Sequence, residues 1–299
     1  MKKSIMLVMA VLMTTSIACD KEDSDDDNNS SSNKSLEMNI SNLGELSADE
    51  RYEGWIIVNG SPVSTGTFSV SSSGIPSQTS FEVMASDLDA ATDYVLSIEP
   101  HPDNDPEPSA IKIAGGSFSG NNATVSVDHP AALGADFNTA SGKYILATPT
   151  TTDMSDENSG IWFLDISSGS PMTGLTLPEL PTGWVYEGWV VLHGEPITTG
   201  RFTDVDMADM AAPFSGSDAS GPPFPGEDFV TNAPSPHSFP TDLRGATAVI
   251  SIEPEPDNSP MPFTFKPLVH MISSTAMDHV TYNLDNQVNS NFPMGTISR

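Results

Sequence analysis

Cysteine is almost absent from this chain of 299 residues, in which Cys19 is the only one. A single thiol cannot form an internal disulfide, so the fold must be stabilised by its hydrophobic core. Basic side chains are also scarce, with 11 Lys and Arg against 40 Asp and Glu and a formal net charge of −29. Such a charge repels phosphate groups, and we therefore expect no nucleic-acid partner.

Recognisable catalytic patterns are missing as well. The sequence contains no Gly-x-Ser-x-Gly motif, phosphate-binding glycine loop or dinucleotide fingerprint, and its six histidines show none of the spacings typical of zinc sites. Ser is abundant, but no Ser has a recognisable base beside it. We therefore predict a protein that is not an enzyme and that requires no cofactor.

Long apolar runs are absent after the amino terminus. There, two lysines precede an apolar run at residues 5–13, which is followed by a Ser-Ile-Ala-Cys sequence ending at Cys19. The run is shorter than the roughly 20 residues that span a bilayer core and is typical of a signal peptide. Because the last four residues resemble a lipobox, we predict a lipoprotein signal peptide over residues 1–18 and a membrane anchor through lipid on Cys19. Ordinary secretion with cleavage nearby is the alternative.

A polar segment follows the signal peptide. Its acidic cluster gives way to a run of Asn and Ser, so residues 19–36 are predicted to be a disordered tether. The acidic cluster resembles the signal that directs some Gram-negative lipoproteins to the outer face of the outer membrane. The predicted location is the bacterial cell envelope, with the outer membrane favoured. Surface exposure is left open because any polar tether would share this composition.

An internal repeat organises the rest of the chain. Tyr-Glu-Gly-Trp at residues 52–55 recurs at 186–189, an offset of 134 (186 − 52), and Ser-Ile-Glu-Pro at 97–100 recurs at 251–254, an offset of 154 (251 − 97). The ordered identities indicate a duplication. The second copy carries 20 extra residues between these blocks, within residues 206–238. That stretch is rich in Pro, Gly, Ser and Asp, and we expect a long surface loop.

Short segments rich in β-branched or aromatic residues predict strands in both copies. They are residues 55–58, 94–98, 123–127 and 144–147 in the first copy and 161–164, 190–192, 249–252 and 280–282 in the second. Asn59-Gly60 and His193-Gly194 are predicted hairpin turns, and no window has the period of a long helix. We therefore predict an all-β fold of two tandem antiparallel β-sandwich domains, at residues 37–150 and 158–299.

Both copies resemble one known extracytoplasmic domain. The resemblance lies in residues 177–189, 194–196 and 199–202, and in the strands that end in Glu-Pro before a proline-containing turn, at 95–108 and 249–262. These segments are similar to the carboxy-terminal domain of RskA-type anti-sigma-K factors. The resemblance implies an outer sensing or protein-interaction module. It does not extend to the sigma-binding segment or the transmembrane helix of such factors, so we do not expect this chain to bind a cytoplasmic sigma factor.

The repeated aromatic residues Tyr52, Trp55, Tyr186 and Trp189 have two interpretations. They could form an exposed platform that binds a glycan or a peptide. Alternatively, they pack in the core, because the aliphatic residues beside them need large partners.

Glu99 and Glu253 each end a strand immediately before a proline. They could be catalytic acids, but a lone carboxylate per copy lacks the partner that acid–base hydrolysis requires. The alternative is that they accept hydrogen bonds from nearby loop amides.

Acidic residues on the turns that follow these strands predict a weak calcium site. Asp103, Asp105 and Glu107 in the first copy, and Asp257 in the second, place several hard oxygens on one turn, which calcium prefers. The second copy replaces two of the three carboxylates, and ordinary turn chemistry is therefore the alternative.

The function predicted from these features is that of an envelope-anchored, non-enzymatic binding or sensing lipoprotein. Its partner would be another protein or an envelope component, and residues 206–238 would be the contact region. The alternative is a calcium-dependent or carbohydrate-binding surface protein that uses the Trp and Asp positions above.

Overall fold

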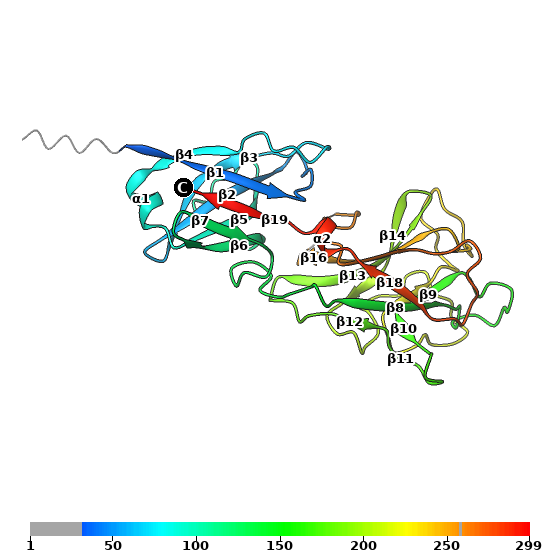
Figure 1. Cartoon of the computed structure of the whole chain (residues 1–299). Helices are drawn as coiled ribbons and strands as arrows, with labels where there is room; N and C mark the ends of the chain where they lie inside the picture. Colours follow the sequence, from blue (N-terminus) through cyan, green and yellow to red (C-terminus); the bar gives the residue numbers. More distant parts are fainter. Residues whose placement is uncertain (1–31, 257–258) are drawn as a thin grey trace, which may run out of the picture. The chain divides into compact units, whose positions relative to one another are not determined.

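The structure is a computed structural model that describes residues 32–256 and 259–299 (Figure 1). Its strands form two large antiparallel sheets, and the helices of the described residues are short, α1 (Ala85–Ala90) and α2 (Val288–Asn291). The predicted all-β class is confirmed. Neither helix in the described part of the chain is long and apolar enough to cross a membrane. The predicted signal peptide and Cys19 lie outside the described residues.

The first sheet has eight strands and forms what we call lobe 1. Its order is β3 (Ser61–Phe68), β2 (Glu50–Val58), β5 (Asp93–Pro100), β6 (Lys112–Ser119), β7 (Asn122–Val125), β19 (Met294–Ser298), β1 (Asn33–Ser41) and β4 (Ser80–Met84). The two end strands, β3 and β4, contact each other, so the sheet curls around its own core. In β1, for example, alternate residues are buried, as expected for a strand with one face on a core.

The second sheet has nine strands and forms lobe 2. Its order is β14 (Glu195–Phe202), β13 (Trp184–Leu192), β16 (Thr247–Pro254), β17 (Leu268–Met271), β18 (Tyr282–Asn286), β8 (Ser141–Leu146), β9 (Gly160–Trp162) and β15 (Gly226–Asp228), with β12 (Leu175–Thr176) paired to β8. A separate pair consists of β10 (Leu164–Asp165) and β11 (Met172–Thr173). The end strands β14 and β15 contact each other, as β3 and β4 do in lobe 1.

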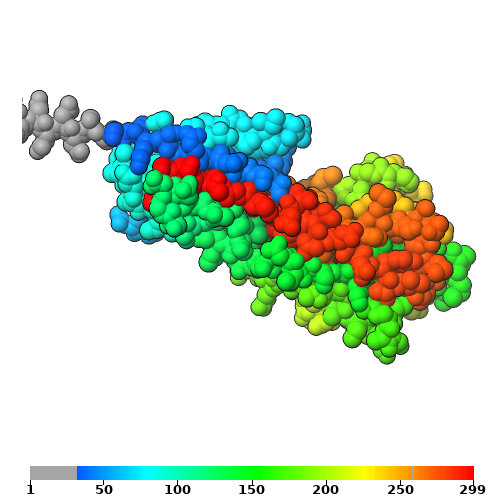
Figure 2. Space-filling view, in the orientation of Figure 1, coloured from blue at the N-terminus to red at the C-terminus, as the bar shows by residue number. Residues whose placement is uncertain are grey.

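The lobes do not coincide with the predicted domain ranges of 37–150 and 158–299. Strand β8, expected in the first copy, pairs with β18, β9 and β12 of lobe 2, and β19, at the end of the second copy, lies between β7 and β1 of lobe 1. Figure 2 shows β19 in red against β1 in blue. The composition of a strand predicts its conformation but not its neighbours, because pairing is decided by residues far apart in the sequence.

The predicted tether also ends earlier than expected. Residues 33–36, assigned to the tether, belong to β1, and Leu36 is fully buried. This strand pairs with both β4 and β19, so polar residues such as Asn33 and Ser35 form its solvent-facing side rather than a disordered segment. Residues 19–31 lie outside the described part of the chain.

The two predicted hairpin turns are confirmed. Asn59 and Gly60 have φ of 51° and 83°, and His193 and Gly194 have φ of 53° and 91°. Positive φ at both central residues is the geometry of a type I′ turn, whose twist matches that of the strands it connects. These turns join β2 to β3 and β13 to β14, and each hairpin contains a register shift just before the repeated Trp.

Candidate functional site

The repeated aromatic residues are buried. Tyr52, Trp55, Tyr186 and Trp189 are only 1, 2, 2 and 3% exposed, respectively. The hypothesis that they form an exposed platform for a glycan or peptide is therefore wrong, and the core interpretation is confirmed. A large aromatic side chain gains more from burial beside the aliphatic strand residues than it would from solvent exposure.

In lobe 1 a chain of hydrogen bonds ties Trp55 to the strand end at Glu99. The indole Nε1 of Trp55 donates to Ser97 Oγ at 2.8 Å, and the Ser97 hydroxyl donates to Glu99. The Ser109 amide donates to both carboxylate oxygens of Glu99, at 2.9 and 3.0 Å. The predicted bond between this buried carboxylate and a loop amide is thus confirmed, and Glu99 connects β5 to the loop before β6.

Lobe 2 repeats the arrangement. Trp189 donates to Ser251 at 2.8 Å, Ser251 donates to Glu253, and the Phe263 amide donates to both oxygens of Glu253 at 2.9 and 3.1 Å. The duplication seen in the sequence therefore extends to individual contacts. Because Trp, Ser and Glu make the same contacts at corresponding positions of both lobes, this cluster has a structural role.

Asp103 and Asp105, two of the residues proposed as calcium ligands, accept hydrogen bonds from amides of their own turn. Asp103 Oδ1 accepts from the Asp105 amide at 2.8 Å, and Asp105 Oδ1 accepts from the Glu107 amide at 3.1 Å. This is the hydrogen bonding of Asx turns, in which a side chain mimics a backbone carbonyl. Among the described residues, no three His, Cys, Asp or Glu side chains are placed to hold a metal ion. Asp257 lies outside the described residues.

The stretch 206–238 is not a simple surface loop. It contains β15, which pairs with β9 and brings Gly226 opposite Trp162 and Asp228 opposite Gly160. Glu227 and Asp228 are both 0% exposed. The expectation of a continuous surface loop is therefore wrong for this segment, because β15 pairs with β9 and Asp228 accepts a hydrogen bond from Trp162 of β9.

Asp228 is surrounded by hydrogen-bond donors. Its Oδ1 accepts from Trp162 Nε1 at 2.8 Å, and its Oδ2 accepts from the amide and the hydroxyl of Thr150 at 2.8 and 2.5 Å. Burial raises the pKa of this carboxyl, and the hydrogen bonds oppose that effect. Asp228 thus joins β15 to β9 and to the loop after β8.

Two further carboxyls hold the same stretch. Glu227 accepts from the Ser215 hydroxyl, from the Phe214 amide at 3.2 Å and from the Asp228 amide at 3.0 Å. Asp209 accepts from the Gly226 amide at 3.1 Å. Burial raises the pKa of both Glu227 and Asp209 to about 7. Sequence reasoning missed these residues because no periodic apolar pattern marks a strand of three residues within a segment rich in Pro and Gly.

The anchored stretch leaves a hollow of about 360 Å³ beside β14, which we call the β14 hollow. Its apolar lining residues are Trp189, Pro196, Ile197, Phe214, Pro234 and Pro260, and its polar lining residues are Glu187, Glu195, Thr198, Ser235, His237 and Ser259. Residues 195–198 are consecutive in β14, which lies at the end of the strand order. A small volume with mostly apolar walls and a few polar groups is typical of a ligand site.

Carboxylates dominate the charge of the β14 hollow. Glu187 is 5% exposed and accepts from the Thr198 hydroxyl at 2.5 Å. Glu195 Oε2 lies 3.1 Å from His237 Nε2, and the side chains of these two residues are 58% and 10% exposed, respectively. None of the described residues that line the hollow is Lys or Arg. The hollow is therefore suited to an apolar group that carries positive charge.

The wall formed by Phe214 and residues 234–237 belongs to the stretch that is longer in the second copy. The opposite wall has an equivalent in lobe 1, since the pair formed by Glu187 and Thr198 corresponds to Glu53 and Ser64 there. The β14 hollow therefore arises where the two copies differ.

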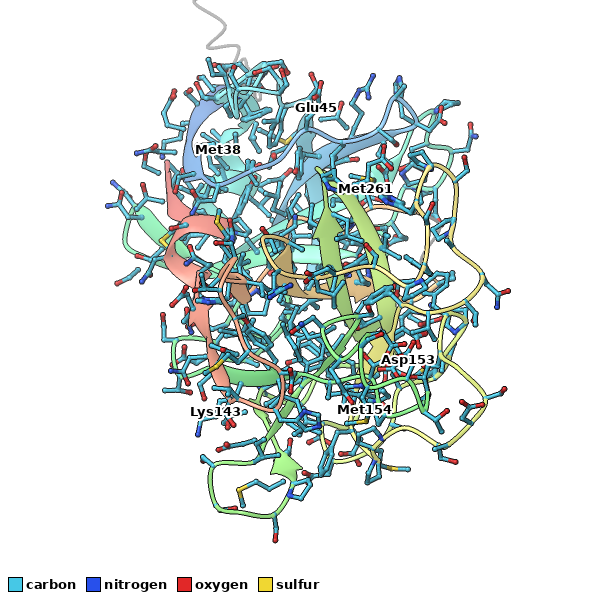
Figure 3. The ribbon with its side chains drawn as sticks, turned by 90° about the vertical axis from the view of Figure 1, so that its right-hand side faces the viewer. Met38, Glu45, Lys143, Asp153, Met154 and Met261 are labelled. Carbon is cyan, nitrogen blue, oxygen red and sulfur yellow. The ribbon has the colours of Figure 1, made fainter. Side chains whose placement is uncertain are left out.

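A second hollow in lobe 2 contains several acidic side chains. It lies between residues 150–156, where Figure 3 labels Asp153, and residues 216–218. Asp218 accepts from the amide and the hydroxyl of Thr152 at 3.2 and 3.1 Å, and Asp153 accepts from the Ser155 amide at 2.9 Å. These carboxylates therefore hold the local loops in place and do not converge on one point.

No family model, curated protein or solved structure matches this chain.

Proposed function

We propose that this protein is an envelope-anchored, non-enzymatic binding or sensing lipoprotein, and that the β14 hollow is its contact site. The observation that carries the proposal is the hollow itself, because it is lined in part by the stretch in which the second copy is longer. Stretches in which one copy of a duplicated fold is longer than the other are common places for binding sites.

The hydrogen bonding of the buried carboxylates supports a binding role over catalysis. Glu99 and Asp228 each accept three hydrogen bonds from the chain itself, which hold them against loops and strands. A general acid or base must instead reach the proton that it transfers. Two carboxylates, Glu187 and Glu195, line the β14 hollow and suit it to binding a positively charged group.

The resemblance to the outer domain of RskA-type anti-sigma-K factors supports the same proposal, since that domain is expected to sense or bind other proteins. The lipobox-like sequence supports an anchor at Cys19. In this proposal the anchor holds the protein at the envelope, and lobe 2 presents the β14 hollow to a protein partner.

Cross-linking and affinity capture from intact cells would test the contact site. Ser235 is exposed and lines the hollow, so Ser235→Lys should block it without disturbing the core. Ser170→Lys, at an exposed position of lobe 2 outside the hollow, makes the same chemical change. We expect Ser235→Lys to lose a partner that both the wild type and Ser170→Lys retain. Equal capture by all three proteins would refute the assignment of the site.

The anchor is tested separately by metabolic labelling with a fatty acid. The wild type should incorporate label and Cys19→Ser should not. Release of unlabelled wild-type protein into the medium would instead support ordinary secretion.

A further inference from the structure

We infer that the β14 hollow binds a lysine or arginine side chain of an extended protein segment. This inference rests on the proposed function, in which the hollow is the contact site. It adds the chemical class of the group that is recognised.

Charge complementarity is the first argument. Two carboxylates, Glu187 and Glu195, line the hollow, and the only basic side chain among its described lining residues is that of His237. The whole chain carries a formal charge of −29, which attracts basic segments over distances longer than one contact. A partner with acidic groups at this position would be repelled both by the two carboxylates of the hollow and by the net negative charge of the whole chain.

The apolar lining is the second argument. A lysine or arginine side chain combines a methylene stem with a charged head, and it packs its stem on apolar surface while the head stays near water or a carboxylate. Pro196, Ile197 and Pro234 supply such a surface, and Glu195 at the rim is half-exposed. A volume of about 360 Å³ accommodates a side chain of this size, at the lower end of the roughly 300–1,000 Å³ of ligand pockets.

The edge strand is the argument for an extended protein segment rather than a free amine. Residues 195–198 of β14 line the hollow along its length, and β14 has a strand neighbour, β13, on one side in the sheet order. Extended segments commonly dock beside such an edge. Farther along, the Met210 amide already donates to the Arg201 carbonyl at 2.8 Å, so the chain itself covers that end of the strand. Pro196 has no amide hydrogen, so this one position cannot donate a backbone hydrogen bond to a docked segment.

Selection of a random heptapeptide phage library on the full chain tests the inference. We expect the enriched peptides to share one Lys or Arg, and to lose at least about tenfold in affinity when that residue becomes Gln, as expected for a charge pair that is partly desolvated. Ser235→Lys should abolish their binding, and Ser170→Lys should not.

Glu195→Gln and Glu82→Gln form a matched pair of variants that separates the site from the general field of the protein. Both remove one negative charge, but Glu82 is exposed on β4 of lobe 1. Glu195→Gln should weaken binding about twofold to fivefold, whereas Glu82→Gln should leave it unchanged. An equal loss in both variants would mean that only diffuse attraction is at work and would overturn the inference.

The remaining outcomes distinguish this inference from the proposed function. Peptides that bind in the hollow without a basic residue would overturn the ligand class and leave the contact site intact. Peptides that bind equally well to wild type and Ser235→Lys would remove the hollow itself. Failure to enrich any peptide would overturn the inference, and the capture experiment on cells would then decide the proposed function.

Discussion

Replacing Ser97 with Ala should destabilise lobe 1 by about 2–4 kcal/mol. The Ser97 hydroxyl is fully buried and makes two hydrogen bonds at once, because it accepts from Trp55 Nε1 at 2.8 Å and donates to Glu99. Alanine removes both and leaves the indole N–H without its acceptor. The methyl group is close in size to the lost side chain, so a large cavity does not contribute.

The magnitude follows from these two losses. A hydrogen bond to a charged group contributes about 1.5–3 kcal/mol, and a buried donor left without a partner costs about 1–3 kcal/mol. The sum is an upper limit because the two bonds share one oxygen and are not independent. Glu99 keeps both bonds from the Ser109 amide, which prevents a complete loss of the strand-end connection.

Equilibrium urea unfolding followed by tryptophan fluorescence would measure the change. Ser251→Ala tests the same contact in lobe 2, where Trp189 donates to Ser251 at 2.8 Å, and should give a loss of similar size. Ser73→Ala, at an exposed position of lobe 1, should change stability by less than about 0.5 kcal/mol. If Ser97→Ala were as mild as Ser73→Ala, the structural role of the repeated cluster would be refuted.

Three further outcomes are expected. Burial raises the pKa of Glu227 to about 7, so the folded state holds that proton more tightly than the unfolded state. This contribution to stability is fully present below about pH 4 and should be lost as pH rises to about 7, by at most about 3 kcal/mol. In urea unfolding across this range, the free energy of unfolding of Glu227→Gln should therefore depend less on pH than that of the wild type. Ile297→Asp, at a fully buried position in β19, should unfold lobe 1 before lobe 2, which limited proteolysis with mass spectrometry would show as early cleavage between residues 33 and 125. Gly60→Ala and Gly194→Ala should each lower stability by about 1 kcal/mol in thermal unfolding, because both residues have positive φ.

The local features of the fold were predictable from the sequence. The hairpins at Asn59-Gly60 and His193-Gly194 depend on residues adjacent in the chain, and the structure gives them the predicted positive φ. The bonds of Glu99 and Glu253 to loop amides were also predictable, because a buried carboxylate at a strand end needs donors and the following loop supplies them.

Strand pairing was not predictable in the same way. Nothing in the composition of residues 141–146 distinguishes a strand of lobe 1 from one of lobe 2, and the same holds for residues 294–298. Their places depend on pairing with strands far away in the sequence, since β8 pairs with β18 and β19 pairs with β1. The burial of Glu227 and Asp228 was also not predictable, since a strand of three residues has too few positions to show a period.

The two lobes differ at the seam where the two end strands of each sheet meet. In lobe 1 the seam lies between β3 and β4, and Phe68 of β3 packs against Phe81 of β4 with ring centroids 5.9 Å apart. In lobe 2 it lies between β14 and β15, and polar groups hold the seam instead, with Asp209 bound to the amide of Gly226 at 3.1 Å. The contacts at the two seams therefore differ in kind, with apolar packing in lobe 1 and a hydrogen bond to a buried carboxyl in lobe 2. The β14 hollow lies beside residues 195–198 of the same strand β14, in the copy that carries the longer stretch.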